Sequence, residues 1–398
     1  MTMLPPLRLK KNEERRLRAG HLWVFSNEVD VAQTPLTAFA PGEAVQVQDA
    51  GGRSLGSAYV NPNSLICARL VSRDPAQPLD RELLLHRLRR ALSLRERLFP
   101  GPFYRLVFGE SDGLPGLVVD RFGEVLVAQI TTAGMERVRE ELVAALGEVV
   151  RPAAILLRND APARSLEGLD SYVEPALGSV PERTEIEENG TRFAVPLLSG
   201  QKTGWFYDHR PNRARMQRYV AEARVLDVFS YIGGWGVQAA VAGAAQVLCV
   251  DSSEPALEEL RRNAALNGVE ERVSTMRGDA FAALGELRAS GERFGAVILD
   301  PPAFVKRKKD LKQGEEAYRR INRLAMELLE PEGILISASC SFHMSRDALL
   351  DAVLRASRSV RHDLQILEEG HQGADHPIHP AIRETGYLKA FFARVLAE

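Results

Sequence analysis

The sequence predicts an α/β protein with three segments: a small curled β-sheet or barrel over residues 1–75, a mixed α+β segment over 76–195 and a doubly wound parallel sheet over 196–398. In the last segment, apolar runs alternate with helical stretches, which is typical of parallel sheets. In the first, short apolar runs flank turn signals such as Asp49–Gly52, which favour antiparallel pairing. A chain of 398 residues is long enough for two or three domains.

The composition is that of a globular protein, and any binding to RNA must come from local basic patches. Apolar residues make up 45% and charged residues 26%, and the net charge of -2 gives no global basic field for nucleic acid. The three cysteines, Cys67, Cys249 and Cys340, have neither disulfide nor metal spacing, which fits a reducing compartment. The start has no signal-peptide pattern and no run is long enough to span a bilayer, so we expect a cytoplasmic protein without membrane contact.

Local signals place several elements of the first two segments. The polar, proline-containing stretch 73–80 reads as a linker, and the apolar spacing after it predicts a helix with Asp80 as its N-cap. The stretch "MERVREELVAALG" predicts a helix that stops at Gly147. Asn189–Gly190, between alternating residues, predicts a hairpin.

The stretch "RVLDVFSYIGGWG" predicts a ligand site after the first strand of the parallel sheet. The strand ends near Asp227 or Val228, and glycines follow before a helix, where backbone amides favour polar ligand groups. Asp251 ends the next strand, and an acid there suits ribose hydroxyls. The G-x-G-x-x-G pattern is missing, so S-adenosylmethionine fits at least as well as a dinucleotide. The alternative is a tight turn without a ligand.

Two further acids follow later strands. Asp279 could hydrogen-bond an adenine amino group, or it could only cap a helix. Asp300 leaves a buried strand into Pro301 and Pro302, which fix the backbone, and Phe304 is suited to stack on a base. The alternative is a stiff loop with an exposed acid. Asp-Pro-Pro and an aromatic after this series of strands indicate a nucleic-acid methyltransferase.

A basic run, "KRKKDLK", begins directly after this motif. Beside a base pocket its cations would contact phosphates, although such a run is usually only a solvated loop. The four cations that we assign to RNA are Lys306, Arg307, Lys308 and Lys309.

Cys340 ends the strand after the Asp-Pro-Pro motif, so its tip should lie beside the strand tip that carries Asp300. Buried cysteines are mostly inert, and Cys67 and Cys249 keep that interpretation. The position of Cys340 favours a nucleophile instead. A thiolate that adds to carbon 6 of cytosine makes carbon 5 reactive toward a methyl sulfonium, and an acid such as Asp300 at the ring's N3 would stabilise the adduct.

The motifs together resemble a known family, the bacterial class I ribosomal RNA large-subunit methyltransferases of the RlmI type. The resemblance covers nearly the whole chain. "KNEERRLRAGHLWVFSNEV" and "GSAYVNPNSLICARL" resemble the family's RNA-binding PUA domain, and "FGESDGLPGLVVDRFG" its central domain. "LLSGQKTGWFYDHRPNR", "LDVFSYIGGWG", "LDPPAF", "SASCS" and "DHPIHPAIRETGYLK" resemble its Rossmann-like catalytic domain.

The resemblance implies a S-adenosylmethionine-dependent enzyme that makes 5-methylcytidine in 23S ribosomal RNA, either naked or in a large-subunit precursor. It also suggests a homodimer, although no interface is visible in the sequence. Cys340 matches the nucleophile. The residues that it implies near the cofactor are Lys202, Thr203, Asp208, Phe229, Ser230, Tyr231, Gly233, Gly234, Asp251, Ser252, Asp279, Ala280 and Asp300.

The identity of the base is left open. Many 5-methylcytosine enzymes carry a second cysteine after a proline at the fourth strand's tip, where this chain has Asp-Pro-Pro. Another group must therefore remove the proton from carbon 5. The alternatives are a guanine N2 or N7 methyltransferase in which Cys340 only packs, an inactive RNA-binding or assembly factor, and, more remotely, a nicotinamide dehydrogenase.

Overall fold

The computed structural model describes residues 4–305 and 307–397, and the chain divides into two compact units. The first unit contains the chain up to Thr184 together with Pro196–Trp205 and Ala374–Thr385. The second contains Glu185–Val195, Phe206–Gly373 and the chain from Gly386 onward. The hairpin before residue 195 groups with the second unit. The domain boundaries near residues 75 and 195 stay predictions.

The N-terminal sheet of the first unit is small, curled and mainly antiparallel, as the turn signals predict. Its strand order is β1-β3-β4-β5-β2, and only the β1–β3 pair is parallel. A short helix, α1 (Glu14–Arg18), accompanies it. The strands are β1 (Pro6–Arg8), β2 (Trp23–Val24), β3 (Glu43–Gln48), β4 (Ser54–Val60) and β5 (Ala68–Ser72).

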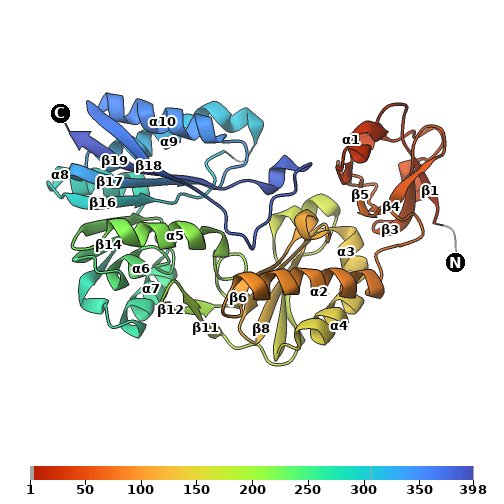
Figure 1. Ribbon diagram of the computed structural model, residues 1–398, viewed down its shortest axis with the longest axis horizontal. Helices are drawn as coiled ribbons and strands as arrows, with labels where there is room; N and C mark the ends of the chain where they lie inside the picture. Colours follow the sequence, from red (N-terminus) through yellow and green to blue (C-terminus); the bar gives the residue numbers. More distant parts are fainter. Residues whose placement is uncertain (1–3, 306, 398) are drawn as a thin grey trace. The chain divides into compact units, whose positions relative to one another are not determined.

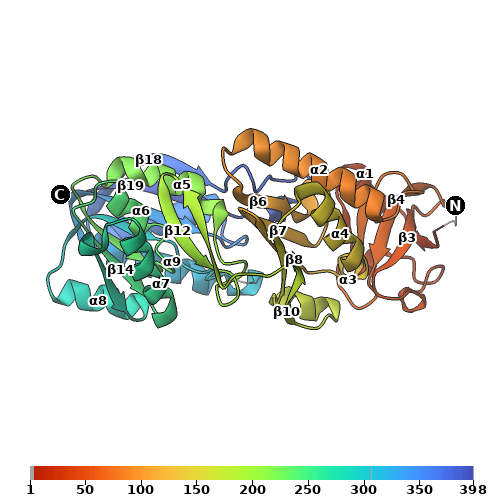
Figure 2. The same ribbon diagram turned by 90° about the horizontal axis from the view of Figure 1, so that it is seen from below.

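The other sheet of the first unit has the order β10-β9-β8-β7-β6, with helices α2 and α4 in mutual contact (Figure 2). Helix α2 begins where the sequence predicts, because the Asp80 side chain accepts a hydrogen bond from Leu83 N at 2.9 Å. The elements are α2 (Arg81–Leu98), β6 (Phe103–Phe108), β7 (Leu117–Phe122), β8 (Val125–Ile130), α3 (Ala133–Arg137), α4 (Arg139–Val150), β9 (Ala154–Asn159) and β10 (Tyr172–Leu177).

The predicted stop at Gly147 is wrong. The helical stretch is divided at Val138, and its second part, α4, continues through Gly147 to Val150. Arg151 takes the left-handed conformation that ends the helix, with φ of 52°. A glycine inside a helix costs only about 1 kcal/mol relative to alanine, so it does not enforce an end.

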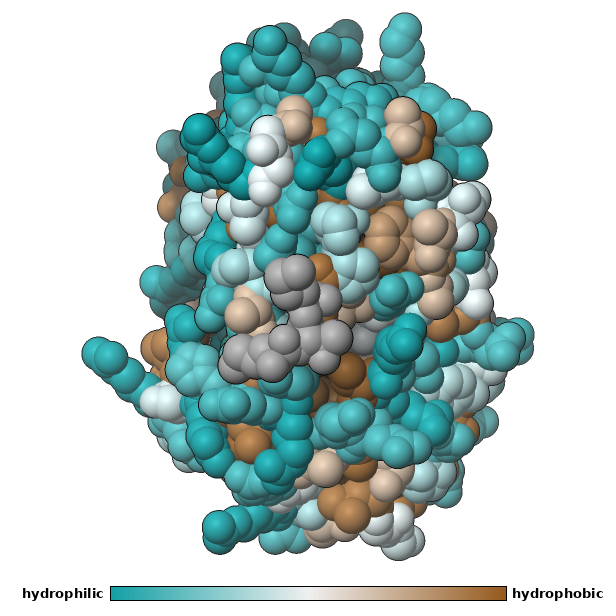
Figure 3. Space-filling view, turned by 90° about the vertical axis from the view of Figure 1, so that its right-hand side faces the viewer, coloured by the Kyte–Doolittle hydropathy of each residue, from teal (hydrophilic) through white to brown (hydrophobic). Residues whose placement is uncertain are grey.

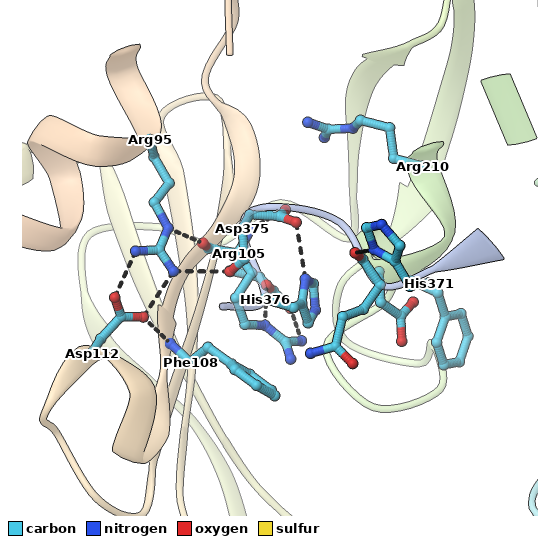
Figure 4. A network of polar contacts seen from close by, with 12 residues as sticks. Arg95, Arg105, Phe108, Asp112, Arg210, His371, Asp375 and His376 are labelled. Atoms are coloured by element: carbon cyan, nitrogen blue, oxygen red, sulfur yellow. Dashed lines mark hydrogen bonds and ion pairs between the residues drawn. The ribbon is translucent and has the colours of Figure 1, made fainter. Parts of the chain in front are cut away.

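A buried ionic network joins distant parts of the first unit (Figure 4). Arg95 is fully buried and makes a bidentate pair with Asp112, with N–O distances of 2.6 and 2.7 Å. Arg95 also donates to the carbonyl of Asp375 at 2.8 Å, and the Asp375 carboxylate accepts from Arg105 N at 3.0 Å. The segment Ala374–Thr385 is thereby held against elements almost 300 residues earlier in the chain.

The second unit contains a hairpin and a seven-stranded sheet. In the hairpin, β11 (Arg183–Glu188) and β12 (Thr191–Pro196) are joined by Asn189 and Gly190, which both have positive φ, as the sequence predicts. The large sheet has the order β15-β14-β13-β16-β17-β19-β18. Its strands are β13 (Arg224–Val228), β14 (Gln246–Asp251), β15 (Val273–Arg277), β16 (Phe294–Leu299), β17 (Leu329–Ser339), β18 (His362–His371) and β19 (Lys389–Ala397).

The five strands from β13 to β17 are parallel, and β19 pairs antiparallel with both β17 and β18. The predicted doubly wound sheet is thus confirmed. Helices α8, α9 and α10 share one apolar core with strand side chains such as Leu226, Val297 and Leu335, while α6 and α7 pack on β13, β14 and β15 (Figure 1). The helices are α5 (Arg210–Met216), α6 (Gly236–Val241), α7 (Glu254–Leu266), α8 (Ala280–Ala289), α9 (Leu311–Met326) and α10 (Arg346–Ser359).

On the face seen in Figure 3, apolar side chains form small separate groups among hydrophilic ones. Within the described residues, no helix combines the length and the apolar character needed to cross a bilayer.

The buried pair of Arg95 and Asp112 yields a stability prediction. We expect Asp112→Ala to lower the free energy of unfolding by about 3–5 kcal/mol, because it leaves a fully buried guanidinium without its carboxylate. Chemical denaturation measures the loss. The matched control is Glu148→Ala, which removes a carboxylate that pairs with Arg81 and Arg89 at the surface and should cost less than about 1 kcal/mol. Equal losses in the two variants would contradict the prediction.

Candidate functional site

The candidate site lies at the carboxyl ends of the parallel strands in the second unit. Strand β13 has β14 on one side and β16 on the other, so the strand order reverses here. In open α/β sheets, ligands bind at this kind of switch point. The strands end near Asp227, Asp251, Asp300 and Cys340, and the last three were predicted as site residues.

The turn after β13 is held in an uncommon backbone conformation. Phe229 and Tyr231 have φ of 68° and 49°, and Gly233 has φ of 92°. Left-handed conformations of non-glycine residues cost about 1–3 kcal/mol each and persist only where the surroundings fix them. Here the amides of Phe229 and Ser230 both donate to the carbonyl of Val250, at 2.9 and 3.1 Å. The turn is thus rigid and follows the end of the neighbouring strand.

Asp251 connects this turn to the next helix. One carboxylate oxygen accepts from Tyr231 N and the other from Ser253 N, both at 2.9 Å. A carboxylate has about four acceptor positions, so Asp251 can still accept hydrogen bonds from a ligand's hydroxyl groups. Ser252, which follows it, is exposed.

Asp279 is the N-cap of α8, which is one of the two roles that the sequence left open. Its Oδ1 accepts from Phe281 N and Ala282 N, at 3.0 and 3.1 Å. The side chain is exposed, and Ala280 beside it is buried. Contact of Asp279 with an adenine amino group stays a prediction.

The glycine at the start of α6 has a packing role that sequence reasoning missed. A Cβ on Gly236 would lie 2.4 Å from Cys249 Sγ and 3.0 Å from Asp227 Oδ2, so only glycine fits. Gly236 N also donates to Asp227 Oδ2 at 2.8 Å. The short gap between α6 and the sheet is therefore set by the protein's own packing.

Asp227 is a fully buried carboxyl group at the centre of this edge. Burial raises its pKa to about 8, and the nearby charges of Asp300 and Asp251 add to the rise. Asp227 is therefore protonated at neutral pH. The sequence assigned no role to Asp227, although an acid within an apolar run is a signal for a buried carboxyl group.

Asp300 has the opposite electrostatic state. Its Oδ2 accepts from Trp235 Nε1 at 3.0 Å, and its Oδ1 lies 3.1 Å from His209 Nε2. Burial alone would raise the pKa of Asp300, but His209 and Trp235 outweigh this effect and hold the pKa below its usual range. Asp300 is therefore a carboxylate at neutral pH, so it can accept a hydrogen bond from a base and is not suited to donate one.

The imidazole ring of His209 lies between Asn212 and Asp300. Asn212 Oδ1 accepts from Arg215 Nη1 at 3.3 Å, so the amide Nδ2 faces His209 Nδ1, at 3.2 Å. On the other side of the ring, Nε2 lies 3.1 Å from Asp300 Oδ1. The stretch "WFYDHRPNR", quoted above only for its family resemblance, thus supplies the partner of the Asp-Pro-Pro acid.

Asp208 comes from the same motif and is buried in the second unit. Its Oδ2 accepts from Tyr387 OH at 2.5 Å, and its negative charge acts on Asp300. Lys202 and Thr203 lie in the first unit, where Thr203 Oγ1 donates to Asp120 Oδ2 at 2.6 Å. Their predicted contact with a cofactor stays a prediction.

Cys340 directly follows β17, whose parallel pairing with β16 brings the tips of these two strands together, as predicted. Its Sγ lies 3.9 Å from the carbonyl oxygen of Pro301. Cys340 is half-buried, whereas Cys67 and Cys249 are buried. Burial raises the pKa of Cys67 to about 12 and that of Cys249 well above its usual value, which suits inert thiols.

The remaining predicted RNA residues differ in exposure. The ring of Phe304 is half-buried in an aromatic cluster, with its centroid 4.9 Å from that of Tyr318 and 6.1 Å from that of Phe281. Pro301 is buried and Pro302 exposed. Arg307, Lys308 and Lys309 are exposed, with Arg307 paired to Asp310 at 3.1 Å, and Lys306 lies outside the described residues.

The raised pKa of Asp227 gives a pH-dependent prediction. Between about pH 4 and pH 8 the folded protein holds a proton that the unfolded chain has lost, so this group's contribution to stability falls by about 1.4 kcal/mol per pH unit as the pH rises. In Asp227→Asn, the free energy of unfolding should lack this slope when it is measured by denaturation from pH 5 to pH 8. The exposed control Asp363→Asn should keep the wild-type slope, and an unchanged slope in Asp227→Asn would refute the buried proton.

Comparison with known proteins agrees with this architecture. A family profile for S-adenosylmethionine-dependent methyltransferases matches residues 165–393, and a PUA-like domain profile matches residues 7–73. The chain is 38% identical to a protein of Cronobacter sakazakii named ribosomal RNA large subunit methyltransferase I, over 98% of both chains. It is 36% identical to a protein of the same name from Klebsiella pneumoniae, over 99% of both.

Solved structures share the fold at low sequence identity. A S-adenosylmethionine-dependent methyltransferase from Streptococcus mutans has a TM-score of 0.83 at 20% identity and covers 98% of this chain and 100% of its own. A second solved methyltransferase, complexed with S-adenosylhomocysteine, has a TM-score of 0.84 with the same coverage. The full-length relatives, the matched profiles and the doubly wound sheet lead to one conclusion: the chain belongs to the S-adenosylmethionine-dependent methyltransferases of the ribosomal RNA large subunit methyltransferase I family, with an N-terminal PUA-like domain.

Proposed function

We propose that this S-adenosylmethionine-dependent methyltransferase transfers its methyl group to carbon 5 of a cytosine in 23S ribosomal RNA, through a covalent adduct with Cys340. The observation that carries this proposal is the half-buried Cys340 at the tip of β17, beside the strand that ends at Asp300. The names of the relatives support ribosomal RNA as the substrate class. The PUA-like profile supports RNA binding by the N-terminal sheet.

The side chains at the sheet edge suit S-adenosylmethionine. Ser230 Oγ is buried and has no hydrogen-bond partner among the described residues, which suits a polar ligand group. Asp251 has acceptor positions left for ribose hydroxyls, and Asp279 Oδ2 is left for an adenine amino group. When bound, the cofactor supplies an electrophilic methyl group.

Cys340 and Asp300 then have separate tasks. The Cys340 thiolate forms a bond to carbon 6, the electron pair of the 5–6 double bond moves into the ring, and N3 takes a proton from water. Carbon 5 would then bond to the methyl group as the sulfur–methyl bond breaks and S-adenosylhomocysteine leaves. After carbon 5 loses its proton to a base, the bond between sulfur and carbon 6 breaks and the thiolate returns. The Asp300 carboxylate accepts a hydrogen bond from the exocyclic amine, and also from N3 once that nitrogen is protonated in the adduct.

The same carboxylate favours one alternative. An ionised Asp300 that accepts from an exocyclic amine would equally suit a guanine, whose N2 amine donates hydrogen bonds. In a guanine methyltransferase Cys340 would only pack against the Pro301 carbonyl. The modified nucleoside distinguishes the two enzymes.

The first experiment identifies the product. The protein is incubated with labelled S-adenosylmethionine and unmodified 23S RNA, and the nucleosides are separated by mass spectrometry. We expect labelled 5-methylcytidine, lost by at least about a thousandfold in Cys340→Ala because the covalent route is removed. Cys67→Ala, which removes a buried thiol from the N-terminal sheet, is the matched control and should keep activity.

A second measurement tests the adduct directly. RNA that contains 5-fluorocytidine should form a denaturation-resistant complex with the wild type and none with Cys340→Ala, because fluorine cannot leave carbon 5 as a proton does. A labelled guanosine without any trapped complex would assign the protein to the guanine alternative.

The exposed cations of the basic run yield a prediction for RNA affinity. Lys308→Ala combined with Lys309→Ala should weaken RNA binding and reduce the slope of log affinity against log salt by about 1.5, because each phosphate contact contributes about 0.7–0.9. Binding is measured by titration at several salt concentrations. The control, Arg355→Ala combined with Arg358→Ala, removes two exposed cations from α10. A slope lowered equally in both variants would show that only net charge matters.

The predicted homodimer is tested separately. Sedimentation of the wild-type protein at micromolar concentration should give the mass of two chains, about 88 kDa for a chain of 44.0 kDa. A single-chain mass would exclude this part of the proposal.

A further inference from the structure

A lysine on β19 stands beside the candidate nucleophile. Strand β19 is antiparallel to β17, and the register places Lys389 opposite Ser339, the last residue of β17. Cys340 is the next residue along the chain. Lys389 belongs to the stretch that resembles the family's C-terminal motif, but neither the sequence nor the reaction described above gives it a task.

Two backbone carbonyls hold the Lys389 side chain, and one of them belongs to Ser341, the residue after Cys340. Its Nζ donates to the carbonyl of Ser341 at 2.5 Å and to that of Tyr387 at 2.8 Å. Within the described part of the chain, no carboxylate pairs with this ammonium group. Its charge is therefore not neutralised by an acid, although the group is partly removed from water.

The electrostatics of the two side chains are linked. Burial lowers the pKa of Lys389 to about 8, and its interaction with the Cys340 thiol acts in the opposite direction. Lys389 is therefore mostly protonated at pH 7. A positive charge that is partly desolvated and close to a thiol favours the thiolate.

We propose that Lys389 is a positioning residue whose ammonium group, held by the Ser341 and Tyr387 carbonyls, keeps Cys340 as a thiolate. In the neutral pair the proton is on sulfur and Nζ has a lone pair. Transfer of that proton to Nζ gives a thiolate and an ammonium, with no change in total charge. The inference rests on the proposed function for its use, because only attack on carbon 6 requires the thiolate.

The pH dependence of thiol alkylation tests this pair without any RNA. The full-length protein is treated with iodoacetamide from pH 5 to pH 10, and modification of the peptide that contains Cys340 is followed by mass spectrometry. For the wild type we expect a midpoint below about 8.5, the ordinary value for cysteine. In Lys389→Gln, which can still donate to Ser341 but carries no charge, we expect a higher midpoint and alkylation about tenfold slower at pH 7.

Three further variants make the result specific. Lys389→Arg retains the charge and should retain the low midpoint. Lys312→Met removes an exposed lysine from α9 in the same unit and should leave the midpoint unchanged. Cys340→Ser should abolish the signal at this peptide. If Lys389→Gln has the wild-type midpoint, or if Lys389→Arg shifts it as much as Lys389→Gln does, the inference is overturned and Lys389 has only a structural role.

The two proposals fail in different ways. A labelled guanosine together with a charge-dependent midpoint would remove the cytosine chemistry and keep the Lys389–Cys340 pair. Labelled 5-methylcytidine together with an unchanged midpoint in Lys389→Gln would keep the cytosine chemistry and remove the role of Lys389.

Discussion

The parallel pairing of β16 with β13 on one side and with β17 on the other is the constraint on which the candidate site depends. Parallel neighbours end at the same edge of a sheet, so chemistry-bearing residues that follow consecutive strands must gather there. Asp227, Asp300 and Cys340 are distant in sequence, yet each lies at the end of one of these three strands. The antiparallel strand β19 then adds Lys389 to the same edge from the opposite direction.

The carboxyl groups at this edge show how surroundings give one residue type different states. Asp227 is enclosed by apolar strand residues and a single amide donor, and it keeps its proton. Asp300 is only half-buried, a histidine and an indole N–H face it, and it is ionised. Because Asp227 is neutral and Asp300 is ionised, the two acids repel each other less than two carboxylates would at this edge of the sheet.

The sequence predicted the elements well, because each has a local signature. The parallel strands were visible as apolar runs, the hairpin as Asn189–Gly190, and the start of α2 as Asp80. The position of Cys340 beside the strand of Asp300 followed from topology alone.

Partners across the chain could not be predicted in this way. Asp300 is contacted by His209, 91 residues earlier, and Cys340 interacts electrostatically with Lys389, 49 residues later. No local pattern encodes such pairs, because a histidine or lysine in a motif has the same local appearance whichever side chain it meets. Gly147 shows that a local signal can also mislead. The sequence predicted a helix end there, but α4 continues through it because a glycine inside a helix costs little free energy.

The division of the chain has a consequence for its synthesis. The first unit takes in Ala374–Thr385, whose Asp375 contacts both Arg95 and Arg105. Although its two sheets are formed from early residues, this unit cannot complete its buried charge network until almost the last codon has been translated. If the N-terminal part folds early on the ribosome, Arg95 lacks one hydrogen-bond acceptor at that stage. This acceptor, the Asp375 carbonyl, is synthesised only after nearly the entire second unit.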